Sequence, residues 1–458
     1  MKKIEVAIIG AGTAGLTARR QVAAHTSNYL VFDGGELGTT CARVGCMPSK
    51  VLIQAANDYY RLQKIAQEGI EVGASKVHGV QVMKHVRQLR DRFTSGVIRS
   101  HENWQEHLIR HHVRFIDEHT FEAGGEKYFA EKIIIATGSS PFIPDQWQQY
   151  SDFIMTTDQF FELEDLPDNL AVIGMGVIGI ELGQALARLG KKVHSFSSNR
   201  RLGGLQDPVI QNYAVDLMAQ EMDLSFQRAK PMGVSSSGKL IVGEADQQFE
   251  FDRVLLTMGR RANLSQLAHP IFENAQVDAH TMQLKGHPHI FIAGDANSEK
   301  PLLHEAADEG VIAGRNAMAG VEKNYRRRVF LSITFSEPNI VMVGENFLQL
   351  SEKKVDFVTG SVSFEGQGRS LVKLKNKGLL HVYVQRQTGE ILGAEMIAPD
   401  GEHLGHLIAW AISCQLSVLQ VLALPFYHPV VEEGLRTALR DAAQQTVLAS
   451  ESLEVFPL

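Results

Sequence analysis

Two glycine-rich turns, about 160 residues apart, constrain the fold of this 458-residue chain more than any other feature. Each turn has the form G-x-G-x-x-G, follows an apolar run, opens a helical pattern and leads to a second apolar run. Their glycines are Gly10, Gly12, Gly15, Gly174, Gly176 and Gly179. The first glycine permits a tight turn, the second lets a pyrophosphate approach the backbone, and the third lets the helix pack on the strand. One copy is weak evidence, but two in matching frames predict two dinucleotide-binding domains rather than chance turns in another α/β protein.

The strand after each turn ends at a position that contacts the ribose of a bound nucleotide. In the first domain this is Asp33, 18 residues after Gly15, which can accept a hydrogen bond from a 2′-hydroxyl. The same count in the second domain gives Ser197, followed closely by Arg200 and Arg201. Hydroxyl and guanidinium groups suit a 2′-phosphate, although both arginines could simply face solvent. The pattern predicts that the second domain uses NADPH at least as well as NADH.

Three further apolar runs end in glycine and supply candidate nucleotide contacts. They read "KIIIATGSS", "RVLLTMGRR" and "HIFIAGDAN". Their end residues are Thr137-Gly138, Gly259 and Gly294-Asp295. An acid at a strand end, such as Asp295, suits a polyol or ribose hydroxyl, but an ordinary turn residue would look the same. After about residue 330 the alternation of "LVKLKNKGLLHVYVQ" predicts an antiparallel sheet.

Composition and charge exclude several classes of function. A net charge of −7 excludes the basic surface of a nucleic-acid-binding protein. The N-terminal apolar run is short and broken by glycines, so we expect no signal peptide. The uncharged stretch Leu407–Phe426 is nearly long enough to span a bilayer, but Gln415, Gln420 and Pro425 favour a buried helix. We therefore expect a cytoplasmic protein that binds neither membrane nor nucleic acid.

The stretch "TCARVGCMPSK" holds two of the chain's three cysteines, Cys41 and Cys46. A zinc site needs about four ligands, and the sequence has no second cysteine pair. A structural disulfide over so short a loop would contribute little in a reducing cytosol. A redox pair fits best because Cys46 precedes a helix, with Pro48 suited to its first turn, and helix N-terminal amides stabilise a thiolate. Coincidence stays open on these residues alone. Cys414, in the apolar stretch, is expected to be inert core.

Histidines supply the candidates for proton transfer. "YHPVVEEG" places His428 five residues before Glu433. A carboxylate on one ring nitrogen fixes the tautomer, so the other nitrogen can exchange a proton with a thiol. Because the chain has 18 histidines, a surface histidine is the ordinary alternative. Four others lie close together in the sequence: His101, His107, His111 and His112. No acid or cysteine set completes a metal site there, so we expect a solvated helix and no metal.

These motifs, in this order and over nearly the whole chain, resemble the flavin-dependent pyridine nucleotide-disulfide oxidoreductases of class I. The resemblance rests on both glycine turns, CxxxxC with PSK, ATG, GD and "HPVVEEG". It implies two Rossmann-like dinucleotide-binding domains, for FAD and NAD(P), plus a C-terminal α+β dimerisation domain. The implied domains are 1–145 (FAD-binding, first part), 146–262 (NAD(P)-binding), 263–330 (central, FAD-binding second part) and 331–458 (dimerisation).

The resemblance also implies roles for individual residues. Cys41 is the interchange thiol that attacks the substrate disulfide, and Cys46 exchanges electrons with the isoalloxazine. Lys50 lies beside the flavin ring with Glu181 as its partner; without the resemblance, a solvated helix charge and a surface acid would be preferred. His428, paired with Glu433, comes from the neighbouring subunit, which implies a homodimer. The implied cofactor contacts are Gly10, Gly12, Gly15, Asp33, Thr40, Lys50, Thr137, Gly138, Gly294, Asp295, Gly174, Gly176, Gly179, Ser197, Arg200 and Gly259.

Within this family the resemblance is closest to the dihydrolipoamide dehydrogenases, which carry a histidine at the place of His304 and a glycine at that of Gly179. The implied substrate is a dithiol or disulfide of lipoyl type. The alternatives are an NADPH-dependent reductase of another disulfide or of a quinone, and a flavoprotein binding subunit without turnover. The chain departs from the family at Thr39, Arg43 and Ala262, where glycine, asparagine and proline are usual. We expect these departures to alter the geometry of the substrate more than the chemistry.

Overall fold

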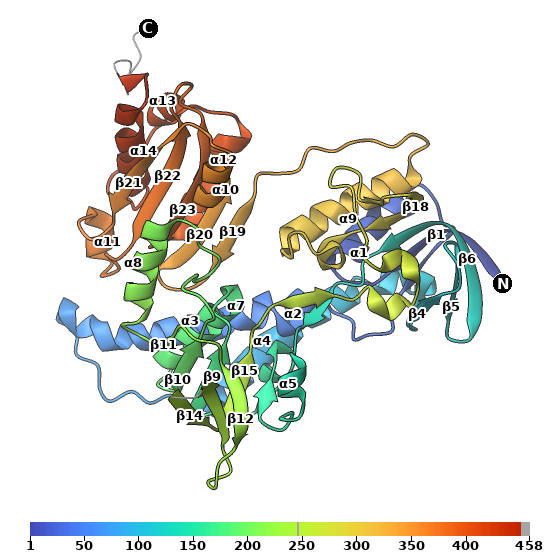
Figure 1. Ribbon diagram of the computed structural model, residues 1–458, viewed down its shortest axis with the longest axis horizontal. Helices are drawn as coiled ribbons and strands as arrows, with labels where there is room; N and C mark the ends of the chain where they lie inside the picture. The colour runs from blue at the N-terminus through green and yellow to red at the C-terminus, as the bar shows by residue number, and fades with distance from the viewer. Residues whose placement is uncertain (245–246, 450–458) are drawn as a thin grey trace. The chain divides into compact units, whose positions relative to one another are not determined.

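The computed structural model describes residues 1–244 and 247–449 and has a mixed α/β structure (Figure 1). The chain divides into two compact units. Unit 1 comprises Met1–Val51, Lys84–Phe142 and Gly259–Arg327; unit 2 comprises Leu52–Met83, Ile143–Met258 and Arg328–Leu458. The units change over at 142, 258 and 327, a few residues before the domain ends that the sequence placed at 145, 262 and 330. The grouping of 52–83 with unit 2 had no signal in the sequence. Residues 450–458 of the expected dimerisation domain lie outside the described residues.

Unit 1 is built on a sheet whose central strands are parallel. Its strands are, in spatial order, β17 (Gln283–Leu284), β18 (His287–Ile292), β6 (Glu126–Ile135), β1 (Lys2–Ile9), β2 (Tyr29–Phe32) and β3 (Leu108–Ile109), with the hairpin of β4 (Val113–Phe115) and β5 (Thr120–Ala123) beside β6. The second half of strand β1, residues 6–9, is a continuous apolar run because both of its faces are covered. Val6 and Ile8 belong to one buried cluster, and Ala7 and Ile9 belong to another.

The helix that follows the first glycine turn, α1 (Thr13–Ala23), packs closely on α9 (Leu303–Met318). A Cβ at Gly310 would lie 2.2 Å from the carbonyl oxygen of Ala14, so only glycine permits this approach. The two helices cover one face of the sheet (Figure 1), and the turn that begins α1 lies at the carboxyl end of β1.

Unit 2 contains a second parallel sheet, which confirms the second dinucleotide fold. Its strands are, in spatial order, β11 (Asp223–Ser225), β10 (Lys192–Phe196), β9 (Asn169–Ile173), β15 (Arg253–Leu256) and β8 (Ile154–Met155). The second glycine turn joins β9 to α7 (Val177–Arg188), and α8 (Pro208–Met218) lies between β10 and β11 in the chain. An antiparallel sheet is formed by β12 (Lys230–Val234), β13 (Leu240–Glu244) and β14 (Gln247–Phe251).

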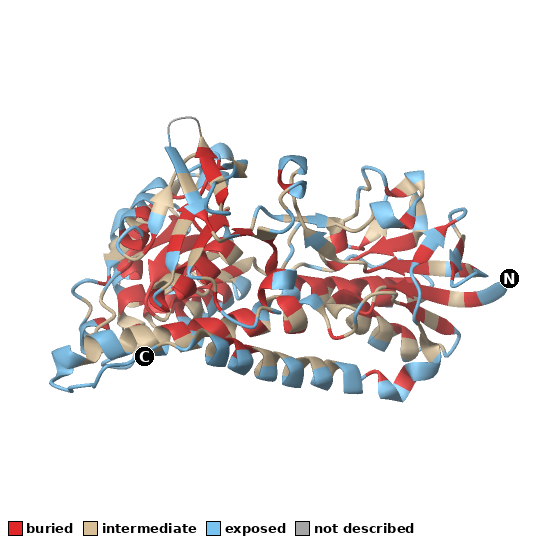
Figure 2. Ribbon diagram, turned by 90° about the horizontal axis from the view of Figure 1, so that it is seen from below, coloured by how far each residue is buried: buried red, intermediate tan, exposed pale blue. Residues whose placement is uncertain are grey.

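The C-terminal part of unit 2 is the antiparallel sheet that the sequence predicted after residue 330. Its strands are β19 (Leu331–Thr334), β20 (Asn339–Gly344), β23 (Ile391–Ala398), β22 (Leu379–Gln385) and β21 (Phe357–Ser363). Helices α12 (Gly401–Ser413) and α14 (Glu433–Gln445) pack on it. Burial is concentrated in the strands (Figure 2), as expected for sheets covered by helices.

The remaining elements are short or connect the sheets. They are α2 (Thr40–Val44), α3 (Cys46–Lys64), α4 (Gly79–Arg99), α5 (Asp145–Gln148), α6 (Thr157–Phe160), α10 (Phe347–Glu352), α11 (Gly368–Val372), α13 (Val418–Leu422), β7 (Ser139–Pro141), β16 (Arg260–Ala262), and the 3₁₀ helices η1 (Ile65–Glu68), η2 (Glu102–His107), η3 (Ser265–Leu267), η4 (Pro270–Phe272) and η5 (Gly294–Asn297).

The expectation of one buried helix over Leu407–Phe426 is wrong. The chain forms α12 and α13 instead, because Gln415 adopts φ +56° and Ser417 caps α13 by accepting a hydrogen bond from the backbone N–H of Gln420 (3.3 Å). Cys414 lies at this break and is exposed, so its assignment to the core is also wrong. Within the described part of the chain, no helix combines the length and hydropathy of a membrane span.

Candidate active site

The first glycine turn is held tightly against the strands beside it. Gly10 has φ +109°, and a Cβ there would lie 2.2 Å from the carbonyl oxygen of Ala136. A Cβ at Gly15 would lie 1.9 Å from the carbonyl oxygen of Gly10, so both positions require glycine. Gly12, in contrast, has open space beside it and precedes α1 without a side-chain cap. The turn therefore leaves the first amides of α1 accessible to a phosphate.

Asp33 directly follows β2 and faces this turn. Its Oδ2 accepts a hydrogen bond from the backbone N–H of Ala11 (2.7 Å), and its Oδ1 accepts one from that of Gly35 (2.8 Å). The carboxylate thus holds two loops at the carboxyl edge of the sheet, where nucleotides bind in such folds. Its contact with a ribose stays a prediction.

A second group of predicted residues gathers at the ends of β6 and β18. The Oδ2 of Asp295, in η5, accepts a hydrogen bond from Ser139 Oγ (2.6 Å), and Arg260 Nε donates to the same hydroxyl oxygen (2.7 Å). Ser139 and Arg260 were missed by sequence reasoning, although both lie in the strand–glycine stretches. The sequence feature that could have identified both residues is a polar side chain directly after the glycine of each stretch.

Several features of this edge fit FAD. Gly138 has φ +68° and, like Gly12, open space where a side chain would be. Among the described residues, the buried Oγ1 of Thr137 has no hydrogen-bond partner, although buried hydroxyls are seldom left unpaired. Open backbone beside an unpaired hydroxyl suits a cofactor with phosphate and polyol groups.

The two cysteines lie at the starts of consecutive helices. Cys41 follows Thr40, the first residue of α2, and Cys46 is the first residue of α3. Both are thiols; the hydrogen bond with Cys46, together with burial, raises the pKa of Cys41. Both effects favour the protonated form of Cys41 over its thiolate. Cys46 begins a 19-residue helix, whose N-terminal amides favour a thiolate at that end.

Two departures from the family pattern brace this loop. Thr39 adopts φ +65°, in the range that favours glycine, and its Oγ1 accepts a hydrogen bond from the backbone N–H of Ala42 (3.3 Å). Arg43 forms an ion pair with Glu36 (Nη2 to Oε2, 2.5 Å) and also donates to the Glu36 carbonyl (3.3 Å). The arginine therefore ties α2 to the loop that follows β2.

Lys50 and Glu181 lie in different units. Lys50 lies one turn into α3, with Nζ 3.4 Å from Ser49 Oγ, and its positive charge acts to lower the pKa of Cys41, against the larger effects that raise it. Glu181, on α7, is buried and accepts a hydrogen bond from the backbone N–H of Phe335 (2.9 Å). Glu181 is therefore not a surface acid, and its pairing with Lys50 stays a prediction.

His428 and Glu433 form the predicted pair within unit 2. Nδ1 of His428 lies 2.9 Å from Oε1 of Glu433, and Oε2 accepts a hydrogen bond from the backbone N–H of Val430 (3.1 Å). The bond to His428 lowers the pKa of Glu433, so the carboxylate is ionised and can support a protonated imidazole. The side chain of His428 is 80% exposed, so the ring is open to a substrate or to another subunit.

The second glycine turn repeats the geometry of the first. Gly174 has φ +102°, and a Cβ there would lie 2.6 Å from the carbonyl oxygen of Thr257. A Cβ at Gly179 would lie 1.8 Å from the carbonyl oxygen of Gly174, whereas Gly176 has open space beside it. Gly259 (φ +95°) is likewise open. This turn also fits a dinucleotide phosphate at the start of α7.

The residues after β10 differ in their surroundings. Ser197 is buried, and its backbone N–H donates to the carbonyl of Ser225 (2.9 Å). The guanidinium of Arg200 lies over the ring of Phe226, 4.8 Å from its centroid, and the exposed Arg201 donates its backbone N–H to Asn199 Oδ1 (2.9 Å). Arg200 is exposed, like Arg201, but its guanidinium is packed against Phe226 at the carboxyl edge of the sheet.

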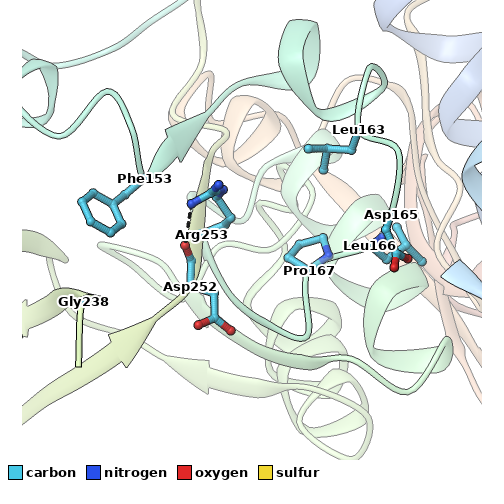
Figure 3. Close-up of a pocket in the computed structure, with 8 residues that line it drawn as sticks. All are labelled: Phe153, Leu163, Asp165, Leu166, Pro167, Gly238, Asp252 and Arg253. Atoms are coloured by element: carbon cyan, nitrogen blue, oxygen red, sulfur yellow. Dashed lines mark hydrogen bonds between the residues drawn. The ribbon is translucent and has the colours of Figure 1, made fainter. Parts of the chain in front are cut away.

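A cavity of about 420 Å³ lies in unit 2, and its lining includes none of the predicted site residues (Figure 3). It is lined by Phe153, Leu163, Asp165, Leu166, Pro167, Gly238, Asp252 and Arg253. Pro167 and Arg253 stand at the amino ends of β9 and β15, the edge opposite to the one where nucleotides bind. The cavity is therefore not the nucleotide site.

The four clustered histidines do not form a solvated helix, so that expectation is wrong. His101 is 4% exposed, lies edge-on to Trp104 with ring centroids 4.8 Å apart, and burial lowers its pKa. His107 ends η2 and stacks on Tyr29 at 4.2 Å. Aromatic neighbours account for both positions. No group of three or more possible metal ligands occurs in residues 1–244 and 247–449.

Similarity to known proteins extends over nearly the whole chain. Dihydrolipoyl dehydrogenase from Bacillus subtilis is 28% identical over 451 residues, which cover 95% of this chain and 97% of that protein. Mercuric reductase from Staphylococcus aureus is 26% identical over 450 residues, 95% of this chain and 81% of that protein. Two solved structures share the fold: LpdA from Mycobacterium tuberculosis (TM-score 0.83, 23% identity) and the HOCl-induced flavoprotein disulfide reductase RclA from Escherichia coli (TM-score 0.81, 21% identity). Each comparison covers 96% of this chain and 99% of the other.

The sequence pattern of the pyridine nucleotide-disulphide oxidoreductases matches residues 4–310, and the pattern of their dimerisation domain matches residues 331–439. The first match alone covers more than half of the chain. Both parallel sheets and the antiparallel C-terminal sheet agree with this assignment and confirm the predicted fold class. The chain belongs to the pyridine nucleotide-disulphide oxidoreductase family, as its motifs predicted.

Proposed function

We propose that this chain is a dihydrolipoyl dehydrogenase-like enzyme, which moves electrons between NAD(P)H and a dithiol or disulfide substrate of lipoyl type. The observation that carries the proposal is the hydrogen-bonded thiol pair of Cys41 and Cys46 at the start of α3, in a chain with two open glycine turns. The lipoyl substrate is supported by the full-length similarity to a dihydrolipoyl dehydrogenase.

The cofactors of the family are FAD and NAD(P)H, as predicted. We place FAD at the first glycine turn with Asp33, Thr40, Lys50, Thr137, Gly138, Gly294 and Asp295. We place NAD(P)H at the second turn with Ser197, Arg200 and Gly259. When bound, FAD would supply two-electron transfer between the nicotinamide and the cysteine pair.

The cysteine pair and the histidine then divide the substrate chemistry. His428 takes the proton of Cys41, and the resulting thiolate attacks one sulfur of the substrate disulfide to form a mixed disulfide; the other substrate sulfur leaves as a thiolate. His428, held by Glu433, gives that thiolate a proton. Cys46, as a thiolate, then attacks Cys41, which leaves a Cys41–Cys46 disulfide and releases the second substrate sulfur as a thiolate that takes a proton from solvent. The substrate is reduced by two electrons and the pair is oxidised by two.

We propose that a homodimer completes the site. The C-terminal part matches the family's dimerisation domain, and large side chains on it are exposed: Trp410 (63%), Leu424 (50%) and Tyr427 (80%). Burial of such side chains against a second copy would be favourable. The exposed ring of His428, next to Tyr427, would then approach the partner subunit's Cys41.

Turnover with a panel of acceptors tests this function. We expect oxidation of NAD(P)H to depend on lipoamide or another disulfide and to stop in Cys41→Ser. Reduction of a quinone that persists in Cys41→Ser would favour the quinone reductase alternative. A protein that binds FAD but turns over no acceptor would favour the binding subunit instead.

The Arg200→Ala variant is expected to lose about 10–100-fold in kcat/KM for NADPH, because a charged hydrogen bond to a phosphate is worth about 1.5–3 kcal/mol. The kcat/KM for NADH should be nearly unchanged, since NADH has no 2′-phosphate. Steady-state kinetics with both nucleotides measure the effect. Arg253→Ala is the matched control, because Arg253 is exposed at the opposite edge of the same sheet. A strong NADH preference that survives Arg200→Ala would reject this choice of nucleotide.

A further inference from the structure

A buried group of charges in unit 1 takes no part in the proposed chemistry. Glu305 and Glu309, on α9, are 2% and 1% exposed, and Arg327 lies between their carboxylates. Nη2 of Arg327 is 2.5 Å from Oε2 of Glu305 and 2.7 Å from Oε1 of Glu309. Lys300 adds a more distant positive charge, 3.8 Å from Glu305. Buried ion groups of this kind are a weak source of stability, so their position in the fold calls for another explanation.

The second oxygen of Glu309 holds the turn that carries Asp295. Oε2 accepts a hydrogen bond from the backbone N–H of Gly294 (2.7 Å) and another from Nδ2 of Asn297 (2.6 Å). Gly294 and Asn297 are the first and last residues of η5, and Asp295 lies between them. Gly294 is itself tightly packed, since a Cβ there would lie 3.0 Å from that of Ala14. One carboxylate oxygen therefore fixes both ends of this turn.

The ionised form of Glu309 is the one that this arrangement requires. A carboxylate can accept from three donors at once, whereas a protonated carboxyl must itself donate. Burial raises the pKa of Glu309, and the hydrogen bond and positive charge of Arg327 act against that rise. Without Arg327, the two buried carboxylates would keep only Lys300, 3.8 Å from Glu305, as a nearby cation, and Glu309 would take up a proton more readily.

We propose that Glu309 is a positioning residue for FAD: it sets the place of Asp295 through η5, and Arg327 keeps Glu309 ionised for that purpose. This inference rests on the proposed placement of an FAD hydroxyl at Asp295. Ser139 orients the Asp295 carboxylate from β7, while Glu309 fixes its backbone from α9. The two supports are independent, and loss of either should loosen the hold on the cofactor.

The test is the rate at which diluted holoenzyme releases FAD, followed by the rise of flavin fluorescence well below the unfolding temperature. Glu309→Gln is expected to release FAD about 10–100-fold faster, the range for loss of a charged hydrogen bond. Arg327→Met should behave like Glu309→Gln, and Arg327→Lys, which keeps the positive charge, should lie closer to the wild type. The double variant Glu309→Gln/Asp295→Asn should be no faster than Asp295→Asn alone, because Glu309 acts through Asp295.

A matched control separates positioning from a general loss of stability. Arg188→Met removes the buried Arg188–Glu221 ion pair of unit 2 (2.7 Å). It should lower the melting temperature without changing FAD release. If Asp295→Asn does not speed release, the proposed placement of FAD fails. If Asp295→Asn speeds release but Glu309→Gln and Arg327→Met do not, the role of Glu309 is rejected and the proposed function stands. The same conclusion follows if Arg188→Met speeds release as much as Glu309→Gln does at an equal loss of melting temperature.

Discussion

Replacing Cys41 with serine is expected to stop disulfide turnover completely, while the long-wavelength absorption band of a Cys46 thiolate beside the oxidised flavin is present before any reductant is added. Replacing Cys46 with serine is expected to abolish that band. The reason is the division of labour in the pair: Cys46 stands at the N-terminus of α3, which favours a thiolate, and Cys41 keeps its proton until it meets the substrate. Anaerobic titration of each variant, followed by absorbance, measures both effects.

Cys414→Ser is the matched control for these two variants. Cys414 is exposed at the break between α12 and α13 and belongs to none of the proposed machinery. It should retain both the band and full turnover. If Cys41→Ser and Cys46→Ser reduced lipoamide or another disulfide at the wild-type rate, the assignment of the redox pair would be wrong.

His428→Ala is expected to slow the half-reaction with the thiol or disulfide substrate by roughly 10²–10⁴-fold, the usual contribution of a positioned acid–base group. Reduction of the flavin by NAD(P)H should be nearly unchanged, because the histidine serves only the sulfur chemistry. Rapid-mixing experiments on the two half-reactions separate these steps. Glu433→Gln should give a smaller loss, since it removes the charge that supports the imidazolium but keeps a side chain that can hold the ring and the Val430 amide.

Mixed dimers test whether the site is shared between subunits. His428→Ala and Cys41→Ser homodimers should each be inactive with disulfides. Heterodimers of the two should recover part of the activity, because one of their two sites then combines an intact Cys41 with an intact His428. Verified heterodimers without any recovery would reject a site built from two subunits. The loss of activity in His428→Ala homodimers alone cannot decide this, because it is expected whether or not the site is shared.

Local motifs carried most of what could be predicted. A G-x-G-x-x-G turn is defined by the steric needs of a few neighbouring residues, such as the 1.9 Å approach at Gly15, so the sequence pattern is nearly sufficient to recognise it. The His428–Glu433 bond spans five positions and is visible in the sequence for the same reason. The helix that the sequence predicted after Cys46 is α3, which begins at Cys46; the short helix α2, which contains Cys41, was not predicted.

Contacts between distant parts of the chain had no such signal. Arg260 and Ser139 are 121 positions apart in the sequence. Each follows an apolar run in a stretch that is typical of a polar turn, so the sequence does not indicate that they form a hydrogen bond. Glu309 is one acid on an ordinary amphipathic helix, and only the fold brings Gly294 and Arg327 to its two oxygens. His101 was predicted to be solvated because histidine is a polar residue type, whereas in the structure its ring is buried against the aromatic ring of Trp104. The break at Gln415 depends on a single backbone conformation, which hydropathy does not report.

The central claim is that electrons reach the substrate disulfide through the pair Cys41 and Cys46. The most direct measurement is a single-turnover experiment in which the flavin is first reduced without oxygen by NADPH or NADH, and lipoamide or another disulfide is then added. The oxidised flavin spectrum should return rapidly in the wild type and in Cys414→Ser, with one disulfide reduced per flavin, and should not return in Cys41→Ser. Return of the spectrum at equal rates in wild type and Cys41→Ser, or no return in wild type with any disulfide, would contradict the claim.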